Sequence, residues 1–244
     1  MKSFTPGTLI ALAASCLSLA AVSHSSGALV HDYEIYDSLA DSLGGPSLIP
    51  NGGTLNAADY SFGPSQGLTL SNALPNPAEY SILIDFSFSS LGGYRRIIDF
   101  KNLTSDTGLY NLNSALNFYP VITGPPAFVP DTEVRLVLTR DAVTGVVTGY
   151  INGILQISFA DGGNLAVFDA GNAIMHFFID DFSVGGEASG GRVSEIAIYD
   201  SPLTPAEVVV LGGPGPIVPE PGSGLLCLSA LAACLGGRLR RSNG

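Results

Sequence analysis

Four oxygen-bearing side chains are the residues in this chain best suited to chemistry. Asp180 and Asp181 follow an apolar stretch, and Asp161 and Asn164 lie in a turn-rich segment before it. Carboxylate and amide oxygens are ligands that Ca²⁺ takes in proteins. These residues are therefore candidate calcium ligands, although the sequence establishes no cofactor and leaves calcium as the one to test. The alternative is that the acids face solvent or accept hydrogen bonds from turn amides.

A serine motif and three histidines are the remaining candidates for catalysis. Gly63-Pro-Ser-Gln-Gly67 matches the G-x-S-x-G pattern, in which a helix follows the serine. Here Leu68-Thr-Leu-Ser71 follows and is typical of a strand, so we expect an ordinary loop. His24, His31 and His176 form no cluster with cysteines that would indicate zinc or a catalytic triad. We expect His176 to be a packed or surface residue of a strand.

Charge and cysteine content narrow the functional class. The chain has 244 residues, of which 46% are hydrophobic and 13% are charged. Residues 29–221 hold six Lys or Arg against all 21 Asp or Glu, a net charge of −15, and no cysteine. So acidic a domain does not neutralise phosphates, which argues against nucleic acid as a partner. Without disulfides, its apolar core must hold it together.

The first 28 residues have the organisation of a secretory signal peptide. Lys2 precedes an apolar segment from about Leu9 to Val22, and small residues follow as far as Ala28. We therefore expect cleavage near the end of this segment and an exported protein. Two alternatives stay open, an amphipathic first helix and a lipoprotein modified at Cys16.

From residue 29 onward, short runs alternate apolar and polar residues, as β-strands do. Residues 80–88 put five apolar side chains on one face, which predicts a half-buried strand. Asn152-Gly153 separates two alternating runs within residues 146–159 and predicts a type I′ hairpin turn. Further strands are predicted at 96–100, 116–119, 133–139, 174–179 and 193–199.

One helix is predicted, at residues 205–211. Thr204 is its N-cap, Pro205 occupies the first helical position, and Glu207 completes a capping box. Gly212-Gly213 ends the helix, and a Pro-rich linker follows. Many short strands with a single helix predict an all-β fold, an antiparallel two-sheet β-sandwich. A closed barrel is the alternative.

The order of several motifs resembles the laminin-G-like, concanavalin A-like jelly-roll domains. The motifs are Tyr94-Arg-Arg-Ile-Ile-Asp-Phe100, Asp106-Thr-Gly-Leu-Tyr110, Leu138-Thr-Arg-Asp141, Gly149-Tyr-Ile-Asn-Gly153, Phe177-Phe-Ile-Asp-Asp181 and Gly190-Gly-Arg-Val-Ser-Glu-Ile-Ala-Ile-Tyr-Asp200. The resemblance implies two stacked antiparallel sheets, one of them with a concave face. It does not imply a ligand, because the fold supports lectins, adhesion modules and hydrolases.

The resemblance also implies two ways of handling sugars. Retaining hydrolases of this class carry paired carboxylates as E-x-D-x-E, about 5 Å apart. No Glu-x-Asp occurs in this chain, so we predict that the protein is not an enzyme. Other members stack sugars on aromatic rings, most often Trp, which is absent here. Tyr94, Tyr110 and Tyr119 are therefore the candidate glycan contacts, and some members bind Ca²⁺ at the rim of the sandwich.

The C-terminal residues are similar to a PEP-CTERM sorting signal. Its parts are Pro219, Glu220 and Pro221, an apolar stretch at about 224–237, and Arg238, Arg240 and Arg241. In that family an exosortase, an inner-membrane protease, recognises the tail. An apolar stretch of about 14 residues is shorter than the ~20 of a stable span, which fits transient membrane contact with the arginines in the cytoplasm. A permanent anchor and a buried core helix are the alternatives.

The sequence thus predicts a signal peptide at 1–28, a laminin-G-like jelly-roll domain at 29–212, a linker at 213–221 and a sorting tail at 222–244. It predicts an exported, non-enzymatic protein of a bacterial cell surface or extracellular matrix, with an adhesive or structural role in exopolysaccharide or biofilm. The expected partners are an exosortase-type protease and extracellular polysaccharide or surface glycan. A carbohydrate-binding, lectin-like module is the alternative function, and a glycoside hydrolase is a distant third.

Overall fold

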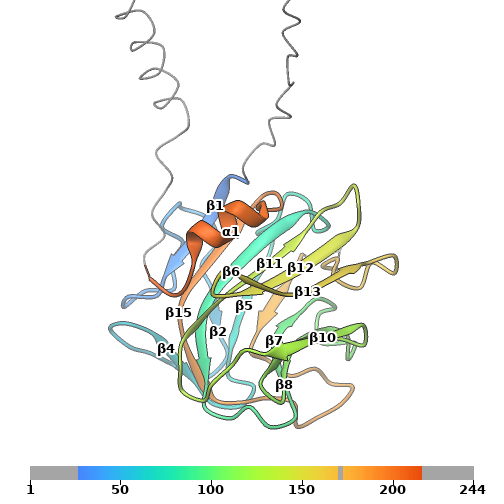
Figure 1. The fold of residues 1–244 in the computed structure, drawn as a ribbon. Coiled ribbons are helices and arrows are strands. Elements are labelled where there is room, and N and C mark those ends of the chain that lie inside the picture. Colours follow the sequence, from blue (N-terminus) through green and yellow to red (C-terminus); the bar gives the residue numbers. More distant parts are fainter. Residues whose placement is uncertain (1–26, 170–172, 216–244) are drawn as a thin grey trace, which may run out of the picture.

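The computed structural model describes residues 27–169 and 173–215, which form two stacked β-sheets and one short helix (Figure 1). Sheet A has eight strands in the order β13-β12-β11-β6-β15-β4-β3, with β1 also paired to β15. Sheet B has seven, in the order β10-β9-β8-β7-β14-β5-β2. All the pairings of the described strands are antiparallel. The predicted two-sheet jelly-roll β-sandwich is confirmed.

The bounds of the elements agree with most of the predicted strands to within two residues. Sheet A contains β1 (Leu29–Glu34), β3 (Thr54–Leu55), β4 (Tyr60–Phe62), β6 (Tyr80–Phe88), β11 (Val134–Arg140), β12 (Val146–Ile151), β13 (Ile154–Ala160) and β15 (Gly191–Tyr199). Sheet B contains β2 (Ile49–Pro50), β5 (Leu68–Leu70), β7 (Tyr94–Asp99), β8 (Gly108–Leu112), β9 (Ala115–Tyr119), β10 (Ile122–Pro126) and β14 (Met175–Phe177). The helix α1 is Pro205–Leu211. The strand predicted at 174–179 is shorter, because only β14 pairs with its neighbours.

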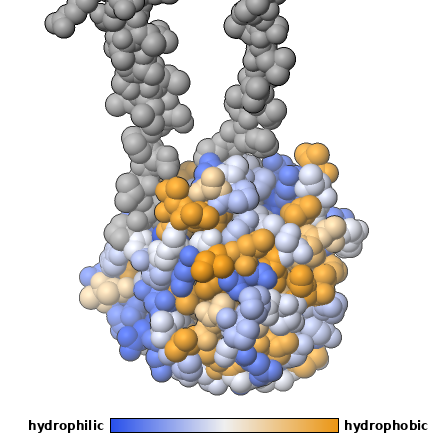
Figure 2. All heavy atoms as spheres, viewed as in Figure 1, coloured by the Kyte–Doolittle hydropathy of each residue, from blue (hydrophilic) through white to orange (hydrophobic). Residues whose placement is uncertain are grey.

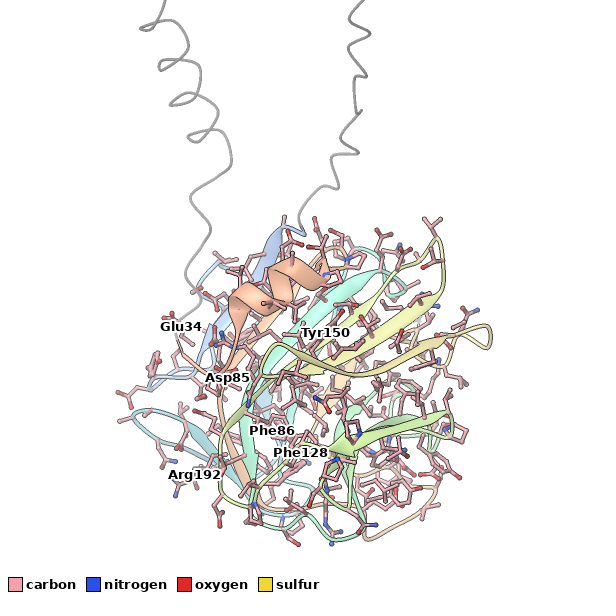
Figure 3. All side chains as sticks on the ribbon, in the orientation of Figure 1. Glu34, Asp85, Phe86, Phe128, Tyr150 and Arg192 are labelled. Atoms are coloured by element: carbon pink, nitrogen blue, oxygen red, sulfur yellow. The ribbon has the colours of Figure 1, made fainter. Side chains whose placement is uncertain are left out.

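The core lies between the sheets, where side chains from alternate strand positions meet. Aromatic rings fill much of it. The rings of Phe62 and Phe178 stack with centroids 4.5 Å apart, and Phe86 and Phe128 lie 6.0 Å apart (Figure 3). All four side chains are buried, so the apolar core that the cysteine-free domain requires is present.

Strand β6 differs from the prediction of a half-buried strand, because it is buried on both faces. Leu83, on its outward side, packs with Val208 of α1 in a second apolar cluster outside the main core. Asp85, also outward, is 2% exposed and is covered by Arg135. Alternation therefore identified the inward side chains correctly, but it could not indicate that other elements cover the outer face.

The hairpin and the helix follow the local sequence as predicted. Ile151 lies opposite Ile154, so Asn152 and Gly153 form the two-residue turn, and both have positive φ, 52° and 78°. Thr204 and Glu207 make both hydrogen bonds of the capping box.

Helix α1 lies across the outer side of sheet A (Figure 1). Val209 and Val210 on α1 and Ile154 and Leu155 on β13 remain exposed, and Figure 2 shows hydrophobic surface over these elements.

Some predicted features lie outside the described residues. These are the signal peptide up to residue 26 and the sorting-signal residues from Pro219 to Arg241. Among the described residues, no helix has the length and apolar character that crossing a membrane requires.

Candidate functional site

The outer face of sheet B carries a continuous row of polar and aromatic side chains. Leu109 and Phe118 point into the core, so their neighbours Tyr110 and Tyr119 point outward. By the same alternation, Arg96 of β7, His176 of β14 and Thr69 of β5 lie on this outer face, which therefore spans five neighbouring strands.

Three tyrosines form one cluster at the end of this row nearest β9. Tyr94, Tyr110 and Tyr119 meet edge to face, with ring centroids 5.4 to 6.5 Å apart. The sequence predicted all three as glycan contacts, and the structure brings them together. Tyr110 is fully buried, however, and its ring lies under the guanidinium of Arg96 at 4.5 Å. Of the three tyrosines, only the half-buried Tyr94 and Tyr119 are accessible for stacking against a sugar ring.

Arg96 is the buried cation around which this face is organised. Its guanidinium donates to Asp99 at 3.0 Å, and also to Asp181 and to the hydroxyl of Tyr110. Asp106 lies 3.6 Å away. A buried charge needs partners of opposite charge, and three carboxylates supply them to the two terminal nitrogens of Arg96, whereas its buried Nε has no hydrogen-bond partner among the described residues.

Glycine at position 108 makes room for this arrangement. A Cβ there would lie 2.5 Å from Nη1 of Arg96, closer than side chains approach one another. Any other residue at this position would push the guanidinium away from Asp99.

Three carboxylates near Arg96 form an acidic triad. Oxygens of Asp106, Asp181 and Glu187 all lie within 4.8 Å of one another, a group that could hold a metal ion. Burial, and then the charge of Asp106, raise the pKa of Glu187 to about 7. One buried oxygen of Glu187 also has no hydrogen-bond partner among the described residues. The triad therefore carries more negative charge than Arg96 balances.

Beside the triad, the same face is hollowed into a groove of about 400 Å³, which we call the sheet B groove. Its lining residues are Asn51, Ser65, Thr69, Leu103, His176, Ile179, Asp180, Asp181 and Phe182. Phe182 is 85% exposed, whereas every other phenylalanine among the described residues is buried or half-buried. The groove thus places an open aromatic ring beside several groups that can form hydrogen bonds.

His176 is held in a chain of hydrogen bonds along the groove. Its Nδ1 lies 2.9 Å from the hydroxyl of Thr69, and its Nε2 lies 3.1 Å from Oδ1 of Asn102. Because the Asn102 oxygen can only accept, His176 carries its proton on Nε2 and accepts from Thr69 at Nδ1. Burial lowers its pKa to about 4, so the ring is neutral at physiological pH.

The four predicted calcium ligands do not form one site. Asp180 and Asp181 line the groove, and Asp181 belongs to the acidic triad. Asp161 and Asn164 instead receive hydrogen bonds from Arg140, at 3.0 and 3.1 Å. Asp161 also accepts two backbone N–H groups, of residues 165 and 166, so it serves the structure of its own turn.

The serine motif forms a turn that leads into β5, as expected, and no helix follows. Ser65 has a positive φ of 58° and lines the groove through this turn. Sequence reasoning missed Phe182, Thr69 and Asn51 as site residues. Only Phe182 offered a clue, because it is a lone aromatic residue between two aspartates and a Ser-Val-Gly-Gly loop.

A second hollow, the sheet A pocket, lies on the outer face of the other sheet and has a volume of about 390 Å³. Arg135 is 2% exposed beside this pocket and holds Asp85, one of the lining residues, through two hydrogen bonds of 2.6 and 2.8 Å. It also donates to Glu195 at 2.9 Å. Figure 3 shows Asp85 on the same side of the molecule as Arg192, which is on the rim of this pocket.

The end of the described chain closes part of this pocket. Arg135 donates to the backbone carbonyls of Leu211 and Gly215, and the N–H of Gly215 lies 3.3 Å from Asp85. Burial, followed by the charge of Asp85, raises the pKa of Glu195 to about 8. The arginine therefore fastens the segment after α1 to sheet A.

The fold has similar solved structures, whereas no protein-family model and no curated protein matches the chain. Domain 4 of an extracellular arabinanase from Geobacillus stearothermophilus, in complex with arabinotriose, has a TM-score of 0.57 and 21% identity, covering 77% of this chain and 99% of that one. A sialidase of Trypanosoma rangeli, in complex with 2,3-difluorosialic acid, has a TM-score of 0.56 and 16% identity, covering 75% of this chain and 32% of that one. The binding domain of botulinum neurotoxin serotype D has a TM-score of 0.53 and 15% identity, covering 75% of this chain and 51% of that one. At these identities the likeness shows the fold alone.

Proposed function

We propose that this protein is an exported, non-enzymatic module that binds carbohydrate through the sheet B groove. The observation that carries the proposal is the exposed ring of Phe182 beside the polar groups of Thr69, Ser65 and Asp180. Sugars present an apolar face and a rim of hydroxyls, and a binding site needs a matching apolar surface with a few placed polar groups. The bound arabinotriose on a domain of the same fold is consistent with this proposal.

The groups of the groove support binding rather than catalysis. His176, with a pKa lowered to about 4, is a weak base, and its ring nitrogens bond to Thr69 and Asn102. Asp181 is bound to Arg96, so it cannot act freely as a nucleophile. Our proposal therefore keeps the prediction of a protein without enzymatic activity.

The proposed setting is a bacterial cell surface or matrix, where carbohydrate binding would give adhesion to exopolysaccharide. Export would rest on the signal peptide, and an exosortase-type protease would process the PEP-CTERM tail after transient membrane contact. Mass spectrometry of the mature protein tests this setting. A chain that still ends at Gly244 would contradict the sorting signal.

A glycan array followed by calorimetry tests the binding function. We expect Phe182→Ala to weaken binding of the best glycan roughly tenfold or more, on the order of 1.4 kcal/mol. Ile154→Ala is the matched control, because Ile154 is 66% exposed on the opposite sheet. Both variants should melt within a few degrees of the parent protein. Equal glycan affinity in Phe182→Ala and Ile154→Ala would show that the binding site does not include Phe182 and lies elsewhere.

We also propose that the acidic triad binds Ca²⁺, because Glu187 has an unpartnered buried oxygen and a raised pKa. Deprotonated Glu187 would be the better ligand, so the affinity for Ca²⁺ should be higher at pH 8 than at pH 6. Calorimetric titration with Ca²⁺ tests this, with Glu187→Gln as the variant and Glu79→Gln as the control. No heat and no change in melting temperature at millimolar Ca²⁺ would exclude the site.

A further inference from the structure

The sheet B groove is lined by acidic side chains and by no positively charged ones. Its lining includes two carboxylates, Asp180 and Asp181, and neither Lys nor Arg. His176 is neutral at physiological pH because burial lowers its pKa. A ligand in the groove therefore meets negative charge and no cationic side chain among the lining residues.

The two aspartates are not equivalent. Asp181 is neutralised by its contact with Arg96. Asp180 has no ion pair among the described residues, and its Oδ2 accepts the N–H of Glu187 at 2.9 Å. Its Oδ1 is buried and has no hydrogen-bond partner among the described residues. The Asp180 carboxylate therefore lines the groove with no cation paired to it and with one oxygen that no protein donor contacts.

Thr69 provides a hydrogen-bond acceptor in the groove. Because His176 carries its proton on Nε2, the Thr69 hydroxyl donates to Nδ1, and its remaining lone pairs are left to accept. The groove thus presents an acceptor at Thr69 and an unpaired carboxylate at Asp180, with the ring of Phe182 as its apolar surface.

From these observations we infer that the sheet B groove selects uncharged glycans and rejects anionic ones. This inference rests on the proposed carbohydrate-binding function and specifies its ligand class. A sugar hydroxyl donates to Thr69 while an apolar sugar face lies against Phe182, beside the carboxylate of Asp180. Uronates, sialic acids and sulfated sugars bring acceptors and a second negative charge to a groove whose side chains offer no cation, so the Ca²⁺-free protein repels them.

Matched pairs of polysaccharides test the inference on the whole exported protein. Neutral glycans such as arabinan, xylan, galactan, mannan and hydroxyethyl cellulose are screened beside polygalacturonate, alginate and hyaluronan. Each neutral binder is then compared with its own carboxymethylated form in Ca²⁺-free buffer at about 20 mM salt, where charges are weakly screened. We expect at least tenfold weaker binding of the carboxymethylated form, and a smaller difference at about 500 mM salt.

The variant Asp180→Asn identifies the source of the discrimination. Asn at this position keeps an oxygen for the N–H of Glu187 but removes the charge. The ratio of neutral to carboxymethylated affinity should fall at least fivefold. Asp131→Asn is the control, because Asp131 has the same charge but lines the sheet A pocket, and its ratio should not change.

The outcomes separate the inference from the function on which it rests. Preference for an anionic glycan, or an equal affinity within a matched pair, would overturn the selectivity while leaving carbohydrate binding intact. Binding to neither panel would overturn the proposed function itself. An unchanged ratio in Asp180→Asn would show that Asp180 is not the selecting residue.

Discussion

The outer face of each sheet carries a buried arginine bound to carboxylates, but the surroundings of the two arginines differ. On sheet A, buried Arg135 is bound to Asp85 and Glu195. On sheet B, buried Arg96 is bound to Asp99 and Asp181. Each arginine therefore has at least two buried carboxylate partners, and each lies at the edge of a hollow.

The difference lies in what covers the two clusters. Helix α1 and the backbone of Gly215 lie over sheet A, and Arg135 donates to that backbone. Over sheet B, the loop that carries Asp181 and Phe182 leaves a groove open beside Arg96. A buried arginine can thus either bind a covering chain segment or support an open surface. Which of the two occurs depends on the segment that lies over the sheet.

The largest expected effect comes from removing the arginine on the closed side. Arg135→Met leaves Asp85 and Glu195 buried without their cation, and we expect the free energy of unfolding to fall by about 3–5 kcal/mol. Urea denaturation measures this. Arg192→Met, whose side chain is 70% exposed, should cost less than about 1 kcal/mol.

The same pair of faces gives a sharper contrast when binding is measured as well. Under the proposed carbohydrate-binding function, the folded fraction of Arg135→Met should keep the glycan affinity of the parent, whereas Arg96→Met should lose both stability and affinity. If Arg135→Met also abolished glycan binding, the outer faces of the two sheets would not be functionally independent.

A smaller effect is expected from pH. Burial raises the pKa of Glu195 to about 8 and that of Glu187 to about 7, above their ordinary value of 4.5. The folded state then binds more protons than the unfolded state between pH 5 and 8, so these groups lower stability as pH rises through that window. His176 acts in the opposite direction, because its lowered pKa reduces stability as pH falls from 6.5 towards 4.

Denaturation at a series of pH values separates these contributions. Glu195→Gln should remove most of the decrease in stability between pH 5 and 8. His176→Gln should remove the decrease in stability below pH 6.5. Glu79→Gln, on a turn, should leave both slopes unchanged. A parent protein that gains stability steadily from pH 5 to 8 would contradict the assignment to Glu195 and Glu187.

The smallest expected effect comes from the N-cap of helix α1, which covers part of the outer face of sheet A. Thr204→Ala removes the acceptor for the N–H of Glu207 and should cost about 1 kcal/mol. Thr132→Ala, at an exposed turn, is the control. Glycan affinity should not change in either variant, because Thr204 lies on the side opposite the groove.

Features that depend on neighbouring residues could be predicted from the sequence. The turn at Asn152-Gly153 and the capping box at Thr204 and Glu207 were both correct, because each is decided within a few residues. The inward face of β6 was also correct, since alternation alone identifies it.

Features that depend on distant segments could not be predicted. Arg96 and Asp181 are 85 positions apart, and no local pattern indicates that they bond. The predicted calcium ligands illustrate the same limit, because Asp161 is bound to Arg140 while Asp181 is bound to Arg96. Composition shows that carboxylates outnumber basic residues, but only the fold shows which of them are left without a partner.

Both ends of the described chain lie on sheet A. Ala28 exchanges hydrogen bonds with Asp200 just after β15, and Gly215 is held by Arg135. A protein tethered through either end would therefore present the groove of sheet B away from its support. Under the proposed carbohydrate-binding function, an array of such copies would bind one polysaccharide chain at many points, and many weak contacts would add up to high avidity.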